Sequence, residues 1–211
     1  MFTGIIREIG SLESVLKKGN ILQYQLKAPQ IASQTELGAS IAINGVCQTV
    51  TKINGDSLSF DAIDETLSKT TIGNFKVGQK VHLEPALTLQ QPLDGHLVYG
   101  HVDGLGVVSH LQKTPGRFDL SIHLPKGGER YVLQGGSIAL DGVSLTVFDC
   151  REDHCSVSLI PETLERTLFA NLKIGDSINV EVDAMGKWIE KWTLGATSHM
   201  NFKEKLQQWG Y

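Results

Sequence analysis

The stretch SIAINGVCQTV, from Ser40 to Val50, returns later in the chain as SIALDGVSLTV, from Ser137 to Val147. Two further pairs keep the offset between Ser40 and Ser137, because DETLSKT returns as PETLERT and NFKVG returns as NLKIG. A repeat that stays in register over this much of a chain indicates two copies of one structural module. The sequence therefore predicts two similar domains, at residues 1–95 and 96–186, followed by a tail at residues 187–211.

The modules read as short strands joined by tight turns. Asn44-Gly45 and Asp141-Gly142 lie between aliphatic runs, and such pairs are strong hairpin signals because both turn residues tolerate positive φ. SLSFDAI and SVSLIPE alternate polar with apolar residues, as half-buried strands do. Many short strands at this spacing favour all-β barrels or sandwiches, and helix is expected only briefly at residues 64–67 and 161–164 and in the tail.

The composition narrows the functional class. Of 211 residues, 41% are hydrophobic and 20% charged, which is typical of a globular protein. A net charge of -4 gives no reason to expect nucleic acid as a partner. We expect neither a signal peptide nor a membrane segment, because no basic start followed by a long apolar run is present. Three cysteines without framework spacing are typical of a reducing compartment, so a cytoplasmic location is expected.

Positions where the two copies differ are the candidates for chemistry. Cys47 corresponds to Ser144, and each stands two residues before a threonine, Thr49 or Thr146, on the same face of a strand. Such a strand presents two short side chains to one pocket. The structural interpretation is that Cys47 is a small buried hydrophobe and that Ser144 only hydrogen-bonds locally.

No metal or cofactor motif is present in the sequence. His96 and His101, in GHLVYGH, would point to opposite faces of a strand, so a shared metal is not expected. Cys150, His154 and Cys155 lack the spacing of paired metal ligands and are interpreted as a turn. Neither a dinucleotide-binding fingerprint, nor a P-loop, nor a hydrolase elbow occurs.

The ordered motifs resemble one known family over nearly the whole chain. MFTGII, GASIAINGVCQTV, DETLSKTTIG, GHLVYGHVDGLG, SIALDGVSLTV, LIPETLERT and VDAMGKWIEKW together are similar to riboflavin synthase of the α-chain type. The resemblance implies an all-β fold of two tandem six-stranded Greek-key barrels plus a C-terminal helix that assembles a homotrimer. It implies the conversion of two 6,7-dimethyl-8-ribityllumazine molecules into riboflavin and 5-amino-6-(ribitylamino)uracil, without cofactor or metal. Its implied ligands are that lumazine and riboflavin, with lumazine synthase as a further partner.

The resemblance also implies a pocket in each barrel. The first would be formed by Gly4, Ile5, Ile6, Cys47, Gln48, Thr49, Asp61, Ala62, Ile63, Asp64, Glu65 and Thr66. The second would be formed by Gly100, His101, Val102, Gly135, Ser144, Leu145, Thr146, Ser158, Leu159, Ile160, Pro161, Glu162 and Thr163. Residues at positions that the family associates with activity are Phe2, Ser40, Cys47, His101, Ser144 and Asp183. His101 and Ser144 would move the proton or activate a nucleophile, with Asp183 orienting them.

Three positions depart from the family pattern. Gln48 stands where leucine is usual, Asp94 where glycine is usual, and Gly135 where a ligand-contacting lysine is usual. Two alternatives therefore stay open. One is a non-catalytic lumazine- or flavin-binding antenna protein on the same barrels. The other is a barrel of the flavin-reductase type, for which the chain has no residues left to build a nicotinamide-binding domain.

Overall fold

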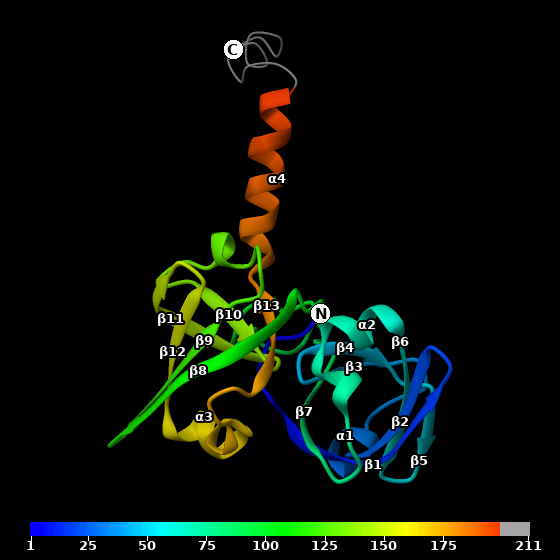
Figure 1. Ribbon diagram of the computed structural model, residues 1–211. Coiled ribbons are helices and arrows are strands. Elements are labelled where there is room, and N and C mark those ends of the chain that lie inside the picture. The colour runs from blue at the N-terminus through cyan, green and yellow to red at the C-terminus, as the bar shows by residue number, and fades with distance from the viewer. Residues whose placement is uncertain (199–211) are drawn as a thin grey trace.

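The computed structural model describes residues 1–198, which form two β units side by side with one long helix projecting away from them (Figure 1). The first unit is a seven-stranded sheet in the order β4-β3-β7-β1-β2-β6-β5. Its strands are β1 (Glu8–Lys18), β2 (Ile21–Lys27), β3 (Ser40–Ile43), β4 (Val46–Thr49), β5 (Lys52–Asn54), β6 (Ser57–Ile63) and β7 (Lys80–Pro85). Its short helices are α1 (Pro29–Ala32), α2 (Asp64–Lys69) and η1 (Thr71–Asn74).

The second unit is a closed barrel in the order β10-β11-β12-β9-β8-β13. Its strands are β8 (Gly104–Thr114), β9 (Arg117–His123), β10 (Ser137–Leu140), β11 (Val143–Arg151), β12 (His154–Leu159) and β13 (Ser177–Val182). The helices are η2 (Glu129–Tyr131), α3 (Pro161–Arg166), η3 (Phe169–Asn171) and the projecting α4 (Ala184–Ser198). The predicted fold class, all-β with a repeated barrel and a C-terminal helix, is confirmed.

The strand count of the first unit differs from the predicted six for a local reason. In the second unit β11 is continuous, whereas its first-half counterpart is interrupted at Val50 and Thr51 and so forms β4 and β5. The Thr51 N–H donates to Ser59 O on β6 at 2.9 Å. The chain therefore crosses from the β3 side to the β6 side at this break, where β11 joins β10 to β12 in the second unit.

The two hairpin turns predicted from Asn-Gly and Asp-Gly meet at the centre of the molecule. Asn44 and Gly45 have φ of 46° and 77°, and Asp141 and Gly142 have φ of 41° and 79°, as type I′ turns require. A Cβ atom on Gly45 would lie 2.5 Å from the backbone nitrogen of Gly142. Glycine is therefore required at this contact for packing as well as for φ.

A matched pair of buried polar residues connects the two units. Leu168 N–H donates to His82 Nε2 at 2.7 Å, so Nδ1 carries the proton that His82 donates to Asp141 O at 3.0 Å. Asn179, the repeat counterpart of His82, donates from Nδ2 to Asn44 O at 2.8 Å. Desolvation of His82 lowers its pKa to about 4, so the imidazole is neutral at pH 7.

Each unit has its own apolar core, and a third, smaller cluster lies at their junction. The alternation of β2 buries Leu22, Tyr24 and Leu26 in the first core, and that of its counterpart β9 buries Phe118, Leu120 and Ile122 in the second. Phe2 is fully buried with Val98 in the junction cluster. Complete burial of one such side chain contributes roughly 1.5–3 kcal/mol, so the N-terminal segment is firmly held.

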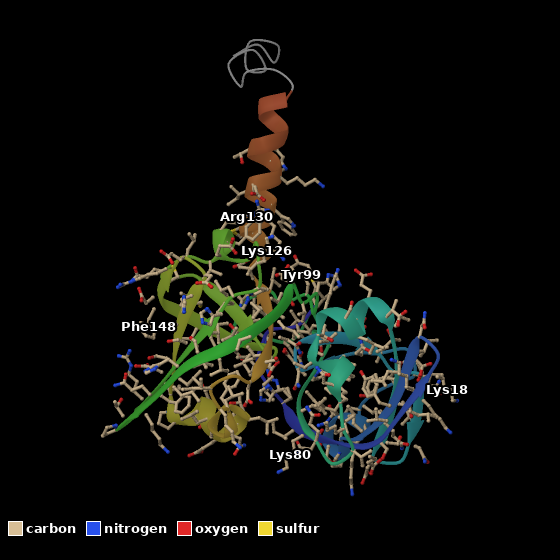
Figure 2. All side chains as sticks on the ribbon, viewed as in Figure 1. Lys18, Lys80, Tyr99, Lys126, Arg130 and Phe148 are labelled. Carbon is tan, nitrogen blue, oxygen red and sulfur yellow. The ribbon has the colours of Figure 1, made fainter. Side chains whose placement is uncertain are left out.

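The base of α4 is attached to the second barrel by polar contacts. The Tyr131 hydroxyl donates to Glu190, Arg130 lies 3.1 Å from the same carboxylate, and Lys187 Nζ lies 2.6 Å from Asp103. Figure 2 shows Arg130 beside this base. Farther along, α4 exposes Trp192, which is 82% accessible. Residues 199–211 of the predicted tail lie outside the described residues. Within residues 1–198, no helix has the length and apolarity needed to cross a membrane.

Candidate active site

Two cavities of similar size occupy equivalent places in the two halves. One has a volume of about 360 Å³ and is lined by Gly4, Ile5, Ile6, Arg7, Val143, Ser144, Glu162, Thr163, Arg166 and Thr167. The other has a volume of about 400 Å³ and is lined by Val46, Cys47, Glu65, Thr66, Lys69, Thr70, Gly100, His101 and Val102. We call them the Ser144 cavity and the Cys47 cavity.

The N-terminal segment of each module contacts the strand of the other module, so that we call the two segments exchanged. Ser144 N–H donates to Gly4 O at 2.8 Å, and Cys47 N–H donates to Gly100 O at 2.9 Å. The expected grouping of Gly4, Ile5 and Ile6 with Cys47 is therefore wrong, as is the grouping of the Gly100 segment with Ser144. The segments cross because Phe2 and Val98 pair in an antiparallel bridge between the units, after which each segment runs toward the opposite module.

The exchanged segments approach the strands so closely that a side chain would not fit. Gly4 and Gly100 have φ of 76° and 78°, in the left-handed region. A Cβ on Gly4 would lie 2.6 Å from Ser144 Cβ, and one on Gly100 would lie 2.6 Å from Cys47 Cβ. Both glycines therefore bring backbone directly beside the residue of interest in each cavity.

Two buried glutamates, which the sequence analysis did not select, hold these segments. Glu84 on β7 accepts from Thr3 N–H at 2.7 Å and from Gly4 N–H at 2.9 Å. Glu181 on β13 accepts from Tyr99 N–H at 2.7 Å and from Gly100 N–H at 2.9 Å. The signal was available, because a glutamate stands at the same repeat position of two strands, between apolar or small neighbours that predict burial.

The electrostatic environment of the two glutamates is also matched. Desolvation raises the pKa of the Glu84 and Glu181 carboxyls, and the backbone hydrogen bonds that they accept oppose the rise. Hydrogen bonds to a carboxylate are stronger than those between neutral groups. Glu84 therefore holds the Gly4 segment, which lines the Ser144 cavity. Glu181 holds the Gly100 segment, which lines the Cys47 cavity.

The strand alternation predicted for Cys47-x-Thr49 and Ser144-x-Thr146 is present. Thr49 and Thr146 are exposed on the same strand faces as Cys47 and Ser144, whereas Gln48 and Leu145 are buried. Gln48 accepts a hydrogen bond at Oε1 from the Tyr24 hydroxyl at 3.2 Å. This departure from the usual leucine therefore lies in the core and adds no group to the Cys47 cavity.

Ser144 has an imidazole partner, but it is His96. Ser144 Oγ lies 2.7 Å from His96 Nδ1. Desolvation lowers the pKa of His96, and the charge of Asp183 opposes the decrease. In the tautomer with the proton on Nε2, His96 accepts the Ser144 hydroxyl proton at Nδ1. The three residues place a hydroxyl, a base and a carboxylate in one region.

His101 lies in the Cys47 cavity and not beside Ser144. Its backbone N–H donates to Glu181 at 3.0 Å, and its ring stacks on Tyr99 with centroids 6.2 Å apart. The expected cooperation of His101 with Ser144 does not occur within one chain. Residues 96–101 form an irregular crossing segment and not the expected strand, and His96 contacts Ser144 whereas His101 lines the Cys47 cavity.

The other predicted site residues lie at varied positions. Asp61 accepts from Gln23 at 3.1 Å, and Ser158 donates to Asp119. Ala62 and Leu159 are buried in the cores, whereas Ile63, Asp64, Ile160 and Pro161 are exposed.

Asp183 accepts from Met185 N–H at 3.0 Å at the start of α4. Ser40 lines a third, larger cavity of about 680 Å³, together with Asp94. Gly135 has φ of 80° and no atom within 4 Å of a built Cβ.

A short helix beside each cavity carries an ion pair. Lys69 lies 2.8 Å from Glu65 on α2, and Arg166 pairs with Glu162 on α3. In the view of Figure 1, α2 lies at the upper side of the first unit and α3 at the lower side of the second. The two cavities share no lining residue. Together the cavities offer hydroxyls, a thiol, imidazoles and backbone amides, which suits a neutral heterocycle that carries a polyol.

Comparison with known proteins gives consistent matches. A profile of the lumazine binding domain matches residues 3–86 and again residues 99–183. The chain is 37% identical to the riboflavin synthase of Actinobacillus pleuropneumoniae over 194 residues, which cover 92% of this chain and 90% of that one. It is 36% identical to the riboflavin synthase of Bacillus subtilis over 208 residues, which cover 99% and 94% of the two chains.

Solved structures with similar folds include LumP in two complexes. LumP complexed with riboflavin matches with a TM-score of 0.81 at 27% identity, covering 87% of this chain and 100% of that one. LumP complexed with 6,7-dimethyl-8-(1'-D-ribityl) lumazine matches with a TM-score of 0.78 at 27% identity, covering 86% and 99%.

Proposed function

The chain belongs to the riboflavin synthase family of lumazine-binding proteins, and from this membership we propose that it is a transferase that makes riboflavin. Two molecules of 6,7-dimethyl-8-ribityllumazine would bind, and one would donate a four-carbon unit to the other. The products would be riboflavin and 5-amino-6-(ribitylamino)uracil. This reaction needs two binding sites for one substrate, and the repeat supplies two related cavities.

The contact between Ser144 and His96 is the observation that carries the catalytic proposal. The C7 methyl group of the lumazine is acidic, because its carbanion delocalises into the ring system. A positioned base of modest strength therefore suffices to remove the proton. His96 is neutral at pH 7, lies 2.7 Å from Ser144 Oγ, and has the charge of Asp183 nearby to favour the imidazolium that forms.

The binding part of the proposal rests on polar groups at and near the two cavities. Thr49 and Thr146 are not among the lining residues, but they expose hydroxyls on the same strand faces as Cys47 and Ser144, and such groups suit a ribityl chain. The exchanged segments place Gly4 and Gly100 against Ser144 and Cys47, which shapes one wall of each cavity. Cys47 and His101 would bind one substrate, and Ser144 and His96 would bind the other.

We propose that the reacting pair forms between two copies of the chain. Because the two cavities of one chain share no lining residue, the Cys47 cavity of one copy would face the Ser144 cavity of another. The exposed apolar side chains Trp188, Ile189 and Trp192 of α4 would provide the contact that assembles a homotrimer. His101 and Ser144 would then meet across the interface between copies.

The domain division at residues 1–95, 96–186 and 187–211 and a cytoplasmic location belong to the same proposal. Cys47, Cys150 and Cys155 are free thiols, which suits a reducing compartment.

The alternative function is ligand binding without turnover, which the likeness to LumP favours. A turnover assay separates the two. The purified chain is incubated with 6,7-dimethyl-8-ribityllumazine alone, and riboflavin absorbance is followed. We expect one riboflavin for every two lumazine molecules consumed. Saturable binding of the lumazine without riboflavin formation would support the alternative and contradict the enzyme.

A further inference from the structure

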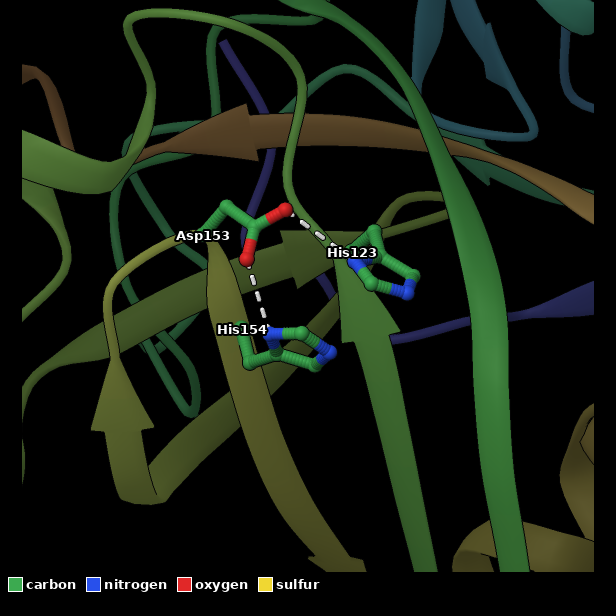
Figure 3. Close-up of side chains that lie close together, drawn as sticks. All are labelled: His123, Asp153 and His154. Carbon is green, nitrogen blue, oxygen red and sulfur yellow. Dashed lines mark hydrogen bonds and ion pairs between the residues drawn. The ribbon is translucent and has the colours of Figure 1, made fainter.

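Three exposed side chains, His123, Asp153 and His154, meet at one end of the second barrel (Figure 3). His123 ends β9, His154 begins β12, and the two are direct partners in the antiparallel pairing of these strands. Their ring centroids lie 4.0 Å apart. The strand register therefore holds two imidazoles side by side.

Asp153 places one carboxylate oxygen against each ring. Its Oδ2 lies 3.1 Å from His123 Nδ1, and its Oδ1 lies 2.8 Å from His154 Nδ1. The backbone is fixed as well, because Asp153 O accepts a hydrogen bond from Leu124 N–H at 2.7 Å.

We propose that His123, Asp153 and His154 form a binding site for a late first-row divalent cation such as Zn²⁺. One ligand atom from each residue lies within 4.8 Å of the others. Imidazole nitrogen and carboxylate oxygen are ligands that this class of cation binds at about 2.0–2.2 Å, and small side-chain rotations close the remaining distance. The cation takes the place of the protons that the rings now direct at the carboxylate.

The surrounding charges and the position of the cluster are compatible with this site. Arg151, the other cross-strand neighbour of His154, pairs with Asp149 at 3.4 Å, which offsets its charge. The length of β12 separates the cluster from α3, roughly 20 Å at the usual rise of a strand. The cation site is therefore distinct from the Ser144 cavity and does not depend on the proposed function. The sequence analysis had grouped His154 with two cysteines, whereas its partners come from β9 and the preceding turn.

Zinc titration of the intact, metal-free chain against a colorimetric chelator tests the proposal. We expect one Zn²⁺ site that weakens at least about tenfold in each of His123→Gln, Asp153→Asn and His154→Gln. The matched control is His110→Gln, an exposed histidine on β8 of the same barrel, which should leave the affinity unchanged.

A second measurement identifies the ligands directly. In ¹H–¹⁵N spectra of the imidazole rings, one equivalent of Zn²⁺ should shift the His123 and His154 signals and leave His110 in place. Equal zinc affinity in all four variants, or ring shifts confined to other histidines, would overturn the proposal. All three site variants should keep wild-type riboflavin formation, so failure of the cation site and failure of the proposed enzyme are separately visible.

Discussion

At the scale of single residues, the proposed chemistry rests on the contact of Ser144 with His96. We expect Ser144→Ala and His96→Gln each to lower kcat by about 10²–10⁴-fold, because each removes half of one proton-transfer unit. The double variant should be little worse than either single one, because residues that act as a unit are not additive. Circular dichroism and steady-state kinetics measure fold and rate. Full multiplication of the two losses would show that the residues act independently.

Gln48 shows how a departure from the family pattern is accommodated. Gln48→Leu should lower the free energy of unfolding by about 1–3 kcal/mol, because the buried Tyr24 hydroxyl would lose its partner. Adding Tyr24→Phe to that variant should recover most of the loss. Urea unfolding of the two single variants and the double variant measures the coupling. An additive double variant would mean that the hydrogen bond contributes nothing.

Asp141 gives a pH dependence with a defined sign. Desolvation raises the pKa of its carboxyl from 3.8 to about 7, so the folded state binds the proton more tightly than the unfolded state does. Burial of the Asp141 carboxyl therefore does not lower the free energy of unfolding below pH 4, and the loss of stability grows as the pH rises to 7. Asp141→Asn, which copies the amide of Asn44, should stabilise the chain at pH 8 by on the order of 1 kcal/mol or more.

The control for Asp141 is the pH at which the two side chains carry the same charge. Near pH 4 the gain from Asp141→Asn should vanish, because aspartic acid and asparagine are then both neutral in the folded chain. Urea unfolding at pH 4.5, 6 and 8 gives the trend. A gain that is constant with pH would show that the carboxyl is not desolvated.

At the scale of elements, the exchanged segments predict that a substitution in one barrel changes ligand binding in the cavity beside a strand of the other. Glu84→Gln should weaken ligand binding in the Ser144 cavity, although Glu84 belongs to β7 of the other unit, because Thr3 and Gly4 would lose a charged acceptor. Glu181→Gln is the matched variant for the Cys47 cavity. Titration with riboflavin, followed by the NMR signals of residues in each cavity, measures the affinity of both cavities. An effect confined to each glutamate's own barrel would contradict the exchange.

The hairpin turns and the strand alternation could be predicted from the sequence. Which module each N-terminal segment contacts could not. The Asn44-Gly45 and Asp141-Gly142 turns could be predicted because positive φ restricts the residue types that fit. The alternation around Cys47 and Ser144 followed from the two-residue period of a strand. An internal repeat, however, aligns the Gly4 segment with the Gly100 segment without saying which barrel each one contacts. That choice depends on the long-range bridge of Phe2 with Val98.

The partner of Ser144 was missed for a related reason. His96 stands in the connection between the modules, where no strand period applies, so a strand argument could not assign its direction. The two buried glutamates were visible in the sequence as an acidic residue at the same position of both repeats. Their function as backbone acceptors depends on the exchange and therefore needed the structure.

At the scale of the whole molecule, the cavities are related by the repeat but hold different side chains. Cys47 and His101 line one cavity, whereas Ser144, which contacts His96, lines the other. A dismutation treats two copies of one substrate differently, so this asymmetry suits the proposed reaction. In our proposal the reacting cavities come from different copies of the chain.

Mixing two inactive variants tests this central claim most directly. Ser144→Ala leaves the Cys47 cavity intact, and His101→Gln leaves the Ser144 cavity intact. After the two variants are unfolded together and refolded as an equimolar mixture, riboflavin formation should return to about a quarter of the wild-type rate, because a site needs one intact cavity from each variant. A mixture no more active than the separately refolded variants would contradict an active site shared between copies.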